Sequence, residues 1–270
     1  MRQDVRVRTD AVASVLARAD AAGRLPRLGG MARPTGVVVV SERFWAFAGT
    51  DGTVREGPMP RRLALCRRIP LLRGLVRLGL SVSPLFRSTG AARRSERLLL
   101  VAALLVPFPF VLLPNVVAFA GGCALSAVML AVLLRGRTLS LHGAEHRAIG
   151  AAEERNLRRT WDGAARPSRF SPRCGTNFAA ITLPVAAALQ LTWPLTVALW
   201  TPVVVVLVAL AVSMEIWQVV QSSSRRPLRA LLAPGLALQR LTTREPSLGE
   251  TRVALVAVAS VLRRELADLE

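Results

Sequence analysis

The chain alternates between arginine-rich segments and two long apolar blocks. No charged residue lies between residues 98 and 134, and Glu215 is the only charge between residues 178 and 219. A transmembrane helix needs about 20 apolar residues, so the first block, of 37 residues, is either two short spans or one long helix, and the second, of 42 residues, is long enough for two spans. Prolines interrupt both blocks, in the second near residues 193–202. The pattern predicts two transmembrane hairpins, or about four spans in total.

The charge distribution predicts how these hairpins are oriented. The chain carries 36 Lys+Arg against 17 Asp+Glu, a formal net charge of +19, and every one of these cations is an arginine. Arginines flank both ends of each apolar block. Since positively charged flanks favour the cytoplasm, only an even number of crossings per block satisfies both ends. We therefore expect a multi-pass membrane protein with both termini in the cytoplasm and its arginines against anionic lipid headgroups.

The remaining segments have the patterns of short, partly buried elements. Residues 5–22 predict a short helix, and residues 37–55 predict two or three strands joined by a turn. Residues 69–87 place two arginines among Leu, Ile and Val at helical spacing. This predicts an amphipathic helix that lies either in the membrane interface or on the N-terminal strands. Residues 250–269 follow a capping-box sequence and predict a C-terminal helix packed on the rest of the protein.

The expected fold is therefore mainly α, a polytopic membrane protein with a small β-containing N-terminal segment. It divides into an N-terminal cytoplasmic segment (1–97), a first transmembrane hairpin (98–134), a cytoplasmic loop (135–177), a second hairpin (178–219) and a cytoplasmic tail with a helix (220–270). Nucleic acid is not an expected partner, because neither interleaved aromatic residues nor a binding motif accompanies the arginines. Three scattered cysteines do not form a disulfide framework.

The two histidines of the chain, His142 and His146, stand four residues apart with Glu145 between them. Positions i and i+4 share one face of a helix, so both imidazoles would point at the same spot. Glu153 falls on the same face of this helix as the two histidines, and Glu145 lies next to that face. The string is also an H-x-x-E-H, the pattern in which two histidines bind zinc and the glutamate acts as general base. The sequence predicts a site for Zn²⁺, or alternatively another divalent metal, with Glu145 or Glu153 as the base.

A zinc site of this kind needs a third protein ligand. The predicted topology brings Cys174 and Glu215 to the same membrane surface as the histidines, and Glu153 is a further candidate. A carboxylate inside an apolar span needs a partner, and a metal ion would serve. The alternative is that the histidines cap the second span or bond to carboxylates, with Cys174 as a small packing residue.

Three strings in the chain resemble signature strings of one bacterial family. They are HGAEHRAIGAAE (142–153), SRFSPRCGTNF (168–178) and LQRLTTREP (238–246), and IPLLRG (69–74) precedes them. Together they are similar to the YqhQ-like membrane proteins, known as domain of unknown function 1385. The resemblance covers roughly residues 65–265.

The resemblance implies a location in the bacterial cytoplasmic membrane and a metal-dependent enzyme. The implied site residues are His142, Glu145, His146, Glu153, Cys174 and Glu215. The chain departs from the family in its first part. The usual glycine-rich segment is represented only by Leu28–Pro34, and the usual glutamate of that segment is missing.

Three classes of function follow from these patterns. The first is a membrane metal-dependent hydrolase that acts at the cytoplasmic face on a peptide or a lipid headgroup. The second is a non-enzymatic membrane scaffold or assembly factor, whose polar strings pack together. The third is a transporter with Glu215 on an ion path, which is less favoured because one ionisable residue offers little pathway unless the protein forms a homo-oligomer. The sequence does not identify the substrate.

Overall fold

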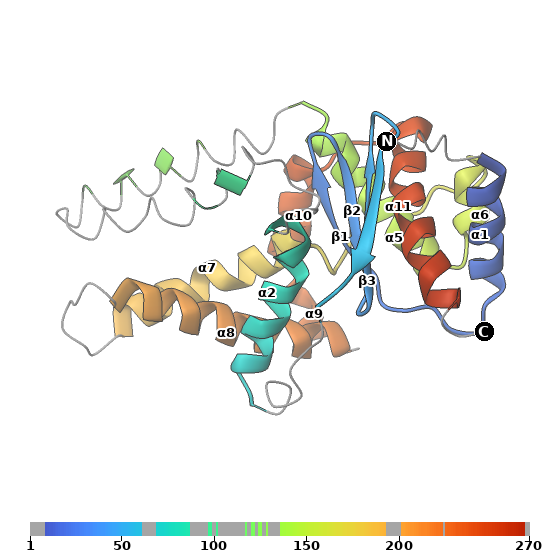
Figure 1. The fold of residues 1–270 in the computed structure, drawn as a ribbon. Helices are drawn as coiled ribbons and strands as arrows, with labels where there is room; N and C mark the ends of the chain where they lie inside the picture. The colour runs from blue at the N-terminus through green and yellow to red at the C-terminus, as the bar shows by residue number, and fades with distance from the viewer. Residues whose placement is uncertain are drawn as a thin grey trace.

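The computed structural model shows a mainly helical chain with one small antiparallel sheet near its N-terminus (Figure 1). The described parts are residues 9–60, 69–86, 136–192, 201–223 and 225–267, with a few single positions between 97 and 128. The predicted first hairpin (98–134) lies almost entirely outside the described residues.

The sheet has four strands in the order β1-β2-β3-β4. They are β1 (Gly29–Arg33), β2 (Gly36–Val40), β3 (Phe44–Gly49) and β4 (Val54–Pro58), each antiparallel to the next. β2 and β3 confirm the strands expected from the valine run and the aromatic run, and β4 confirms the strand expected after the turn at residues 50–53. β1 was not expected, because two glycines and a nearby proline are poor strand formers. Pro34 lies in the turn that joins β1 to β2.

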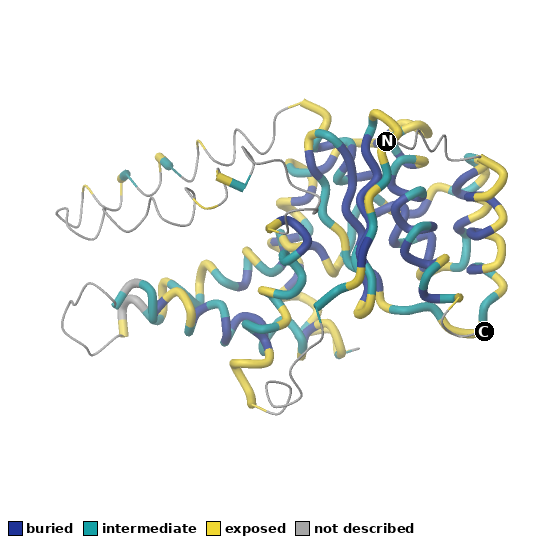
Figure 2. Tube along the Cα trace, viewed as in Figure 1, coloured by how far each residue is buried: buried dark blue, intermediate teal, exposed yellow. Residues whose placement is uncertain are grey.

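The two faces of the sheet contact different helices, because successive side chains of a strand point to opposite sides. Val37 and Val39 face the main core, which α5 (Thr138–Glu153) and α11 (Leu248–Ala267) share. Val38, Trp45 and Phe47 face the other side and pack around Leu85 of α2 (Leu72–Phe86). Figure 2 shows the continuous buried zone that results along the middle strands.

Four helices lie on the core side of the sheet, where two of them contact its strands (α5 and α11) and the other two pack against α11. They are α1 (Thr9–Ala21), α5 (Thr138–Glu153), α6 (Leu157–Trp161) and α11 (Leu248–Ala267). α11 lies against β2, β3, α5 and α1, so the expected C-terminal helix does pack on the rest of the protein. Most residues of α5, polar ones included, are buried.

The start of α11 has the predicted capping box. The backbone N–H of Ser247 donates to Glu250 Oε2 at 2.9 Å, and the N–H of Glu250 donates to Ser247 Oγ at 3.2 Å. The hydroxyl of Ser140 on α5 donates to Glu250 as well. Burial alone would raise the pKa of Glu250, but these hydrogen bonds and the charge of Arg137 outweigh it and lower the pKa.

This lowered pKa predicts a pH-dependent contribution to stability. A carboxyl with a lower pKa in the folded chain stabilises above its unfolded pKa, and the contribution is lost as the pH falls through the folded pKa. We expect Glu250→Gln to lower the free energy of unfolding by about 1 kcal/mol at pH 7, and by less below about pH 4. Urea unfolding in mild detergent at both pH values measures this. An equal loss at both values would contradict it.

A second group of helices lies beside the sheet. It comprises α2 (Leu72–Phe86), α7 (Gly175–Thr192), α8 (Thr201–Ser222), α9 (Arg226–Ala230) and α10 (Ala233–Thr242). α7 and α8 pack along each other, and α2 crosses α8 (Figure 1). Among the described residues one segment, Val203–Ser222, is long and apolar enough to cross a membrane, while Gly175–Leu189 is apolar but shorter. The four predicted spans are therefore supported only in part.

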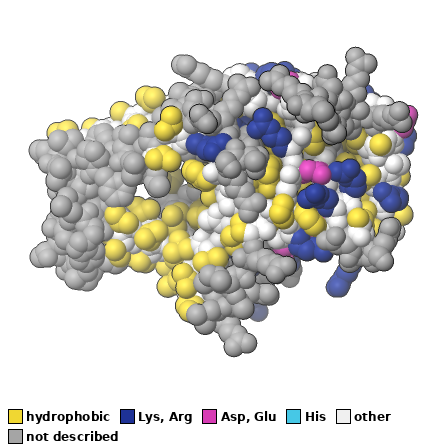
Figure 3. Space-filling view, in the orientation of Figure 1, with side chains coloured by type: hydrophobic (Ala, Val, Ile, Leu, Met, Phe, Trp, Pro, Cys, Tyr) yellow, Lys and Arg dark blue, Asp and Glu magenta, His cyan; other side chains and the backbone are white. Residues whose placement is uncertain are grey.

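Exposed apolar side chains gather on the α7–α8 pair. Figure 3 shows hydrophobic atoms over this end of the molecule. Leu183 is 69% exposed, Val219 55%, Val206 51% and Leu207 46%. An exposed apolar surface of this kind marks an interaction site rather than a surface kept in water, and it is weak support for membrane association.

Candidate metal centre

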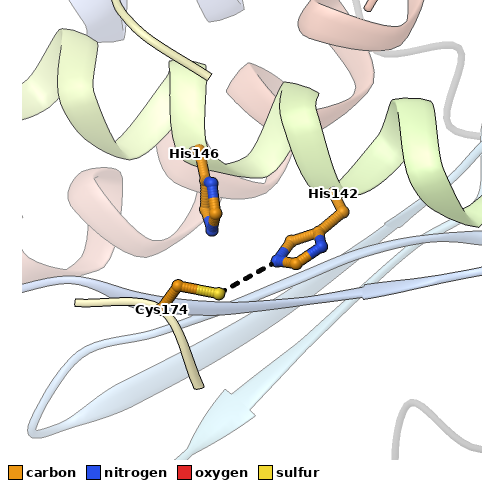
Figure 4. Close-up of side chains that lie close together, drawn as sticks. All are labelled: His142, His146 and Cys174. Carbon is orange, nitrogen blue, oxygen red and sulfur yellow. Dashed lines mark hydrogen bonds between the residues drawn. The ribbon is translucent and has the colours of Figure 1, made fainter. Parts of the chain in front are cut away.

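Two histidines and one cysteine meet between α5 and the start of α7 (Figure 4). His142 and His146 project from consecutive turns of α5, and Cys174 immediately precedes α7. One ligand atom from each residue lies within 4.8 Å of the other two. His142 Nε2 is 3.2 Å from Cys174 Sγ. The i, i+4 spacing thus acts as predicted and aims both rings at one point.

Backbone carbonyls hold both imidazole rings. The oxygen of Thr242 lies 2.8 Å from His142 Nδ1, and the oxygen of Arg169 lies 2.6 Å from His146 Nδ1. A carbonyl only accepts hydrogen bonds, so each neutral ring carries its hydrogen on Nδ1 and its lone pair on Nε2. Metal-binding histidines have this same arrangement, in which a carbonyl fixes the tautomer and the ring orientation.

The lone pair of His146 has no partner in the described part of the chain. His146 is only 3% exposed, and its Nε2 atom is buried without a hydrogen bond. A buried polar atom left unpaired costs about 1–3 kcal/mol. Two imidazole nitrogens and a thiol sulfur are ligands that zinc prefers, so the donor set fits this ion.

Glu145 lies beside this cluster on the buried side of α5. The side chain packs against β1, where a Cβ atom at Gly30 would lie only 2.5 Å from Glu145 Oε1. Burial raises the pKa of Glu145 to about 7, partly offset by the positive charge that His142 carries when it is protonated. None of the described residues forms a hydrogen bond or ion pair with its carboxyl group. A carboxyl with a pKa near neutrality is suited both to accept and to release a proton.

One cavity connects these groups. Its volume is about 330 Å³, and β1, α5 and the loop before α7 form its walls. The residues that line it are Leu28, Gly29, Gly30, Met31, Ala32, Thr138, Leu139, His142, Glu145, His146, Ile149, Ser171, Arg173, Cys174, Gly175, Thr176 and Thr242. The three candidate ligands and Glu145 therefore face a space large enough for part of a substrate.

The three signature strings hold one another in place around the centre. Gln239 of α10 is fully buried, accepts from the N–H of Ser171 at 2.8 Å and donates to its carbonyl at 2.8 Å. The buried Arg147 donates to the carbonyl of Pro167 at 3.1 Å and pairs with Glu245 at 2.6 Å. These contacts fix the loop that presents Cys174 relative to α5.

Close packing at Gly143 adds to this arrangement. A Cβ atom at this position would lie 2.2 Å from the carbonyl oxygen of Arg244, which is backbone and has little room to move. Within a helix, Gly→Ala ordinarily gains about 1 kcal/mol. We expect Gly143→Ala to lower the free energy of unfolding by about 2 kcal/mol instead, because of the overlap.

Gly150 on the same helix is the matched control, since its Cβ would meet the nearest atom of Pro167 at 3.4 Å. Gly150→Ala should be neutral or stabilising. Urea unfolding of both variants tests the pair, and a Gly143→Ala variant as stable as Gly150→Ala would contradict the predicted overlap.

The structure does not bring Glu153, the second candidate base and a candidate ligand, into the cluster of His142, His146 and Cys174. Glu153 is the last residue of α5, partly exposed, and forms an ion pair with Arg173. It is absent from the walls of the cavity described above. The prediction used only the angle of each residue around the helix axis. Glu153 lies about two turns beyond His146 along that axis, so it does not reach the same point.

Glu215 also lies elsewhere. Its carboxylate is paired with Arg73, whose Nε donates to Oε1 at 2.8 Å, and it accepts from the N–H of Leu71 at 3.1 Å. The close approach of α2 to α8 at Gly74, where a Cβ would lie 2.8 Å from Met214 Cβ, permits this pairing. An arginine of the IPLLRG string thus supplies the partner that a semi-buried carboxylate needs.

Sequence reasoning missed several groups that form the site. Thr242 and Arg169 contribute through backbone carbonyls, which no side-chain pattern reveals. Gly30 contributes through its lack of a side chain. Gln239 and Arg147 lie within the signature strings, so the strings were the one signal that pointed toward them.

Comparison with known proteins agrees with the resemblance seen in the strings. The model of the family described as "Protein of unknown function (DUF1385)" matches residues 99–264. The chain is 28% identical over 299 aligned positions to the "Uncharacterized protein YqhQ" of Bacillus subtilis (strain 168), covering 89% of this chain and 93% of that protein. No solved structure matches it. The chain belongs to the YqhQ-like DUF1385 family.

Proposed function

We propose that the protein is a membrane-associated metal-dependent hydrolase. Its Zn²⁺ ion would be held by His142, His146 and Cys174, and Glu145 would act as the general acid–base residue. The observation that carries the proposal is the buried Nε2 atom of His146, which has no partner among the described residues although a carbonyl orients its ring. A structural packing role would leave this desolvated lone pair uncompensated.

The ligand number supports a catalytic rather than a structural ion. Structural zinc sites are closed by four protein ligands, whereas catalytic sites have three and keep one position open. When bound, the ion supplies Lewis-acid polarisation of a carbonyl or phosphoryl oxygen. Glu145 would take a proton from the attacking water and return it to the leaving group. A nearby dication would lower the pKa of Glu145 and keep it in the accepting form.

The proposed location is the cytoplasmic face of the membrane, in a multi-pass protein. Two observations support it: the apolar helix α7 begins directly after Cys174, and the candidate span lies in α8, packed along α7. The arginines on both sides of each apolar block would then contact anionic headgroups. The predicted two-hairpin topology stays part of this proposal.

Cobalt substitution tests the ligand set directly. Protein loaded with Co²⁺ should show a thiolate-to-cobalt charge-transfer band, because Cys174 would be a ligand. The band should be absent in Cys174→Ser and present in Cys66→Ser and Cys123→Ser, which change the other two cysteines. A band that persists in Cys174→Ser, or no band in the wild type, would contradict the proposed ligand set.

A further inference from the structure

The peptide groups of β2 that face β3 can be identified from two hydrogen bonds at the ends of this strand pair. Ser41 N donates to Phe44 O at 2.8 Å, and Thr50 N donates to Thr35 O at 2.9 Å. In an antiparallel sheet, successive residues of a middle strand bond alternately to the two neighbouring strands. The odd-numbered residues of β2 therefore bond to β3, and its even-numbered residues bond to β1.

This alternation determines which peptide groups of β1 face outward. Val38 of β2 is opposite Met31, and Gly36 is opposite Arg33, so Met31 and Arg33 bond to β2. The N–H and C=O groups of Gly30 and Ala32 must then point away from the sheet. β1 is an end strand, and no described residue bonds to these outward groups.

The outward groups lie at the candidate metal centre. Gly30 and Ala32 line the same cavity as the two histidines, Cys174 and Glu145. Gly30 is exposed and lies directly against the Glu145 side chain. This edge of the sheet, with which no described residue pairs, thus runs along one wall of the cavity that holds the proposed chemistry.

The opposite edge of the sheet is protected. β4 ends in Pro58, which has no N–H to offer, and contains Glu56, which binds Arg263 at 2.9 Å. Prolines and charges of this kind prevent a strand from pairing with another chain. The cavity-lining stretch of β1, from Gly29 to Ala32, has small or apolar side chains instead. An edge that no described residue covers by pairing, beside a candidate catalytic centre, is suited to a ligand that pairs with it.

We propose that β1 binds the substrate as an added strand, so that the substrate of the proposed hydrolase is a polypeptide in extended conformation. This inference rests on the proposed function. Added strands gain affinity from main-chain hydrogen bonds, here to Gly30 and Ala32. A lipid headgroup has no repeating amide to use these groups.

The reaction is the hydrolysis of a peptide bond in that strand. The water oxygen bonds to the carbonyl carbon, and the bond from this carbon to nitrogen breaks. Glu145 takes a proton from the water and passes it to the departing amine, so the products are a carboxylic acid and an amine.

The first test uses a peptide library made by digesting a bacterial proteome with trypsin, incubated with the zinc-loaded full chain in detergent. Mass spectrometry should find new cleavage sites that disappear in Glu145→Gln. One cleaved peptide is then synthesised with single backbone N-methyl groups along its length. The rate of cleavage should be lowered when the N-methyl group stands at every second residue and not when it stands at the residues between. This two-residue period is the one expected for strand pairing.

The second test removes one hydrogen-bond donor from each edge of the sheet. Ala32→Pro deletes an outward N–H of β1, and proline is tolerated at such positions. We expect kcat/KM for the cleaved peptide to fall about three- to tenfold, the value of one hydrogen bond, with the zinc content unchanged. Val54→Pro deletes an outward N–H of β4 and should change neither quantity.

The outcomes separate the two proposals. A protein that binds zinc through the predicted ligands but cleaves no library peptide overturns the polypeptide substrate and leaves the metal centre intact. The same holds if cleavage shows no two-residue period, or if Ala32→Pro cleaves as well as Val54→Pro. A protein that binds no zinc overturns the proposed function itself.

Discussion

Replacing His146 by alanine is expected to weaken the binding of Zn²⁺ by more than about 100-fold. Losing a residue that only hydrogen-bonds to a ligand weakens metal binding by up to about 100-fold, and losing the ligand itself should cost more. The reason is that His146 Nε2 is the buried atom whose lone pair has no other described partner. Alanine removes this ligand and leaves only two. Competition with a chromophoric zinc chelator measures the affinity of the purified protein in detergent.

The same titration distinguishes the candidates for the third ligand. Cys174→Ser should weaken zinc binding strongly, whereas Glu153→Gln and Glu215→Gln should not, because these carboxylates pair with Arg173 and Arg73. Strong loss of affinity in Glu215→Gln with an unchanged Cys174→Ser would show that the pairing seen in the structure is not the one that matters for the metal.

Replacing Glu145 by glutamine is expected to lower the turnover of a cleaved substrate by about 100- to 10,000-fold, the usual contribution of a positioned acid–base group. Zinc binding should persist, since Glu145 is not one of the three clustered ligands. Glutamine keeps the shape of the side chain beside Gly30 but does not accept a proton. Single-turnover cleavage and zinc content, measured on the same preparation, separate the two effects.

Glu153→Gln is the matched control for this prediction. Its carboxyl lies on the same helix but is partly exposed and paired with Arg173, so turnover should change by less than about fivefold. If Glu153→Gln loses turnover and Glu145→Gln retains it, the roles of the two carboxylates were assigned the wrong way round.

The histidine pair illustrates what the sequence was able to predict. Its spacing correctly indicated that both rings share one face of a helix, and the charge pattern brought Cys174 to the same region. The positions of Glu145 and Glu153 relative to the cluster became visible only in the structure. Glu153 is seven residues beyond His146, which is about 10 Å along the helix axis. The angle of a residue around the axis does not show this separation.

The environment of Glu145 was not predictable from its own segment. Its burial depends on β1, a strand that the sequence did not suggest because its glycines are poor strand formers. The same glycine that weakens the strand signal leaves room for the Glu145 side chain. Local propensity and tertiary packing conflict at this point, as they often do at functional sites.

Glu215 shows a different limit. The sequence indicated that a lone carboxylate in an apolar helix needs a partner, and this requirement is met. An arginine and a metal ion both satisfy the charge, so composition does not choose between them. The choice depends on the packing of α2 against α8, which places Arg73 beside the carboxylate.

The most direct test of the central claim is the zinc content of the wild-type protein, purified in detergent without added metal, beside the double variant His142→Ala/His146→Ala. Elemental analysis should find one zinc ion per chain in the wild type and none in the double variant. A wild type without stoichiometric zinc, or a double variant that retains it, would contradict the metal centre and favour a non-enzymatic scaffold.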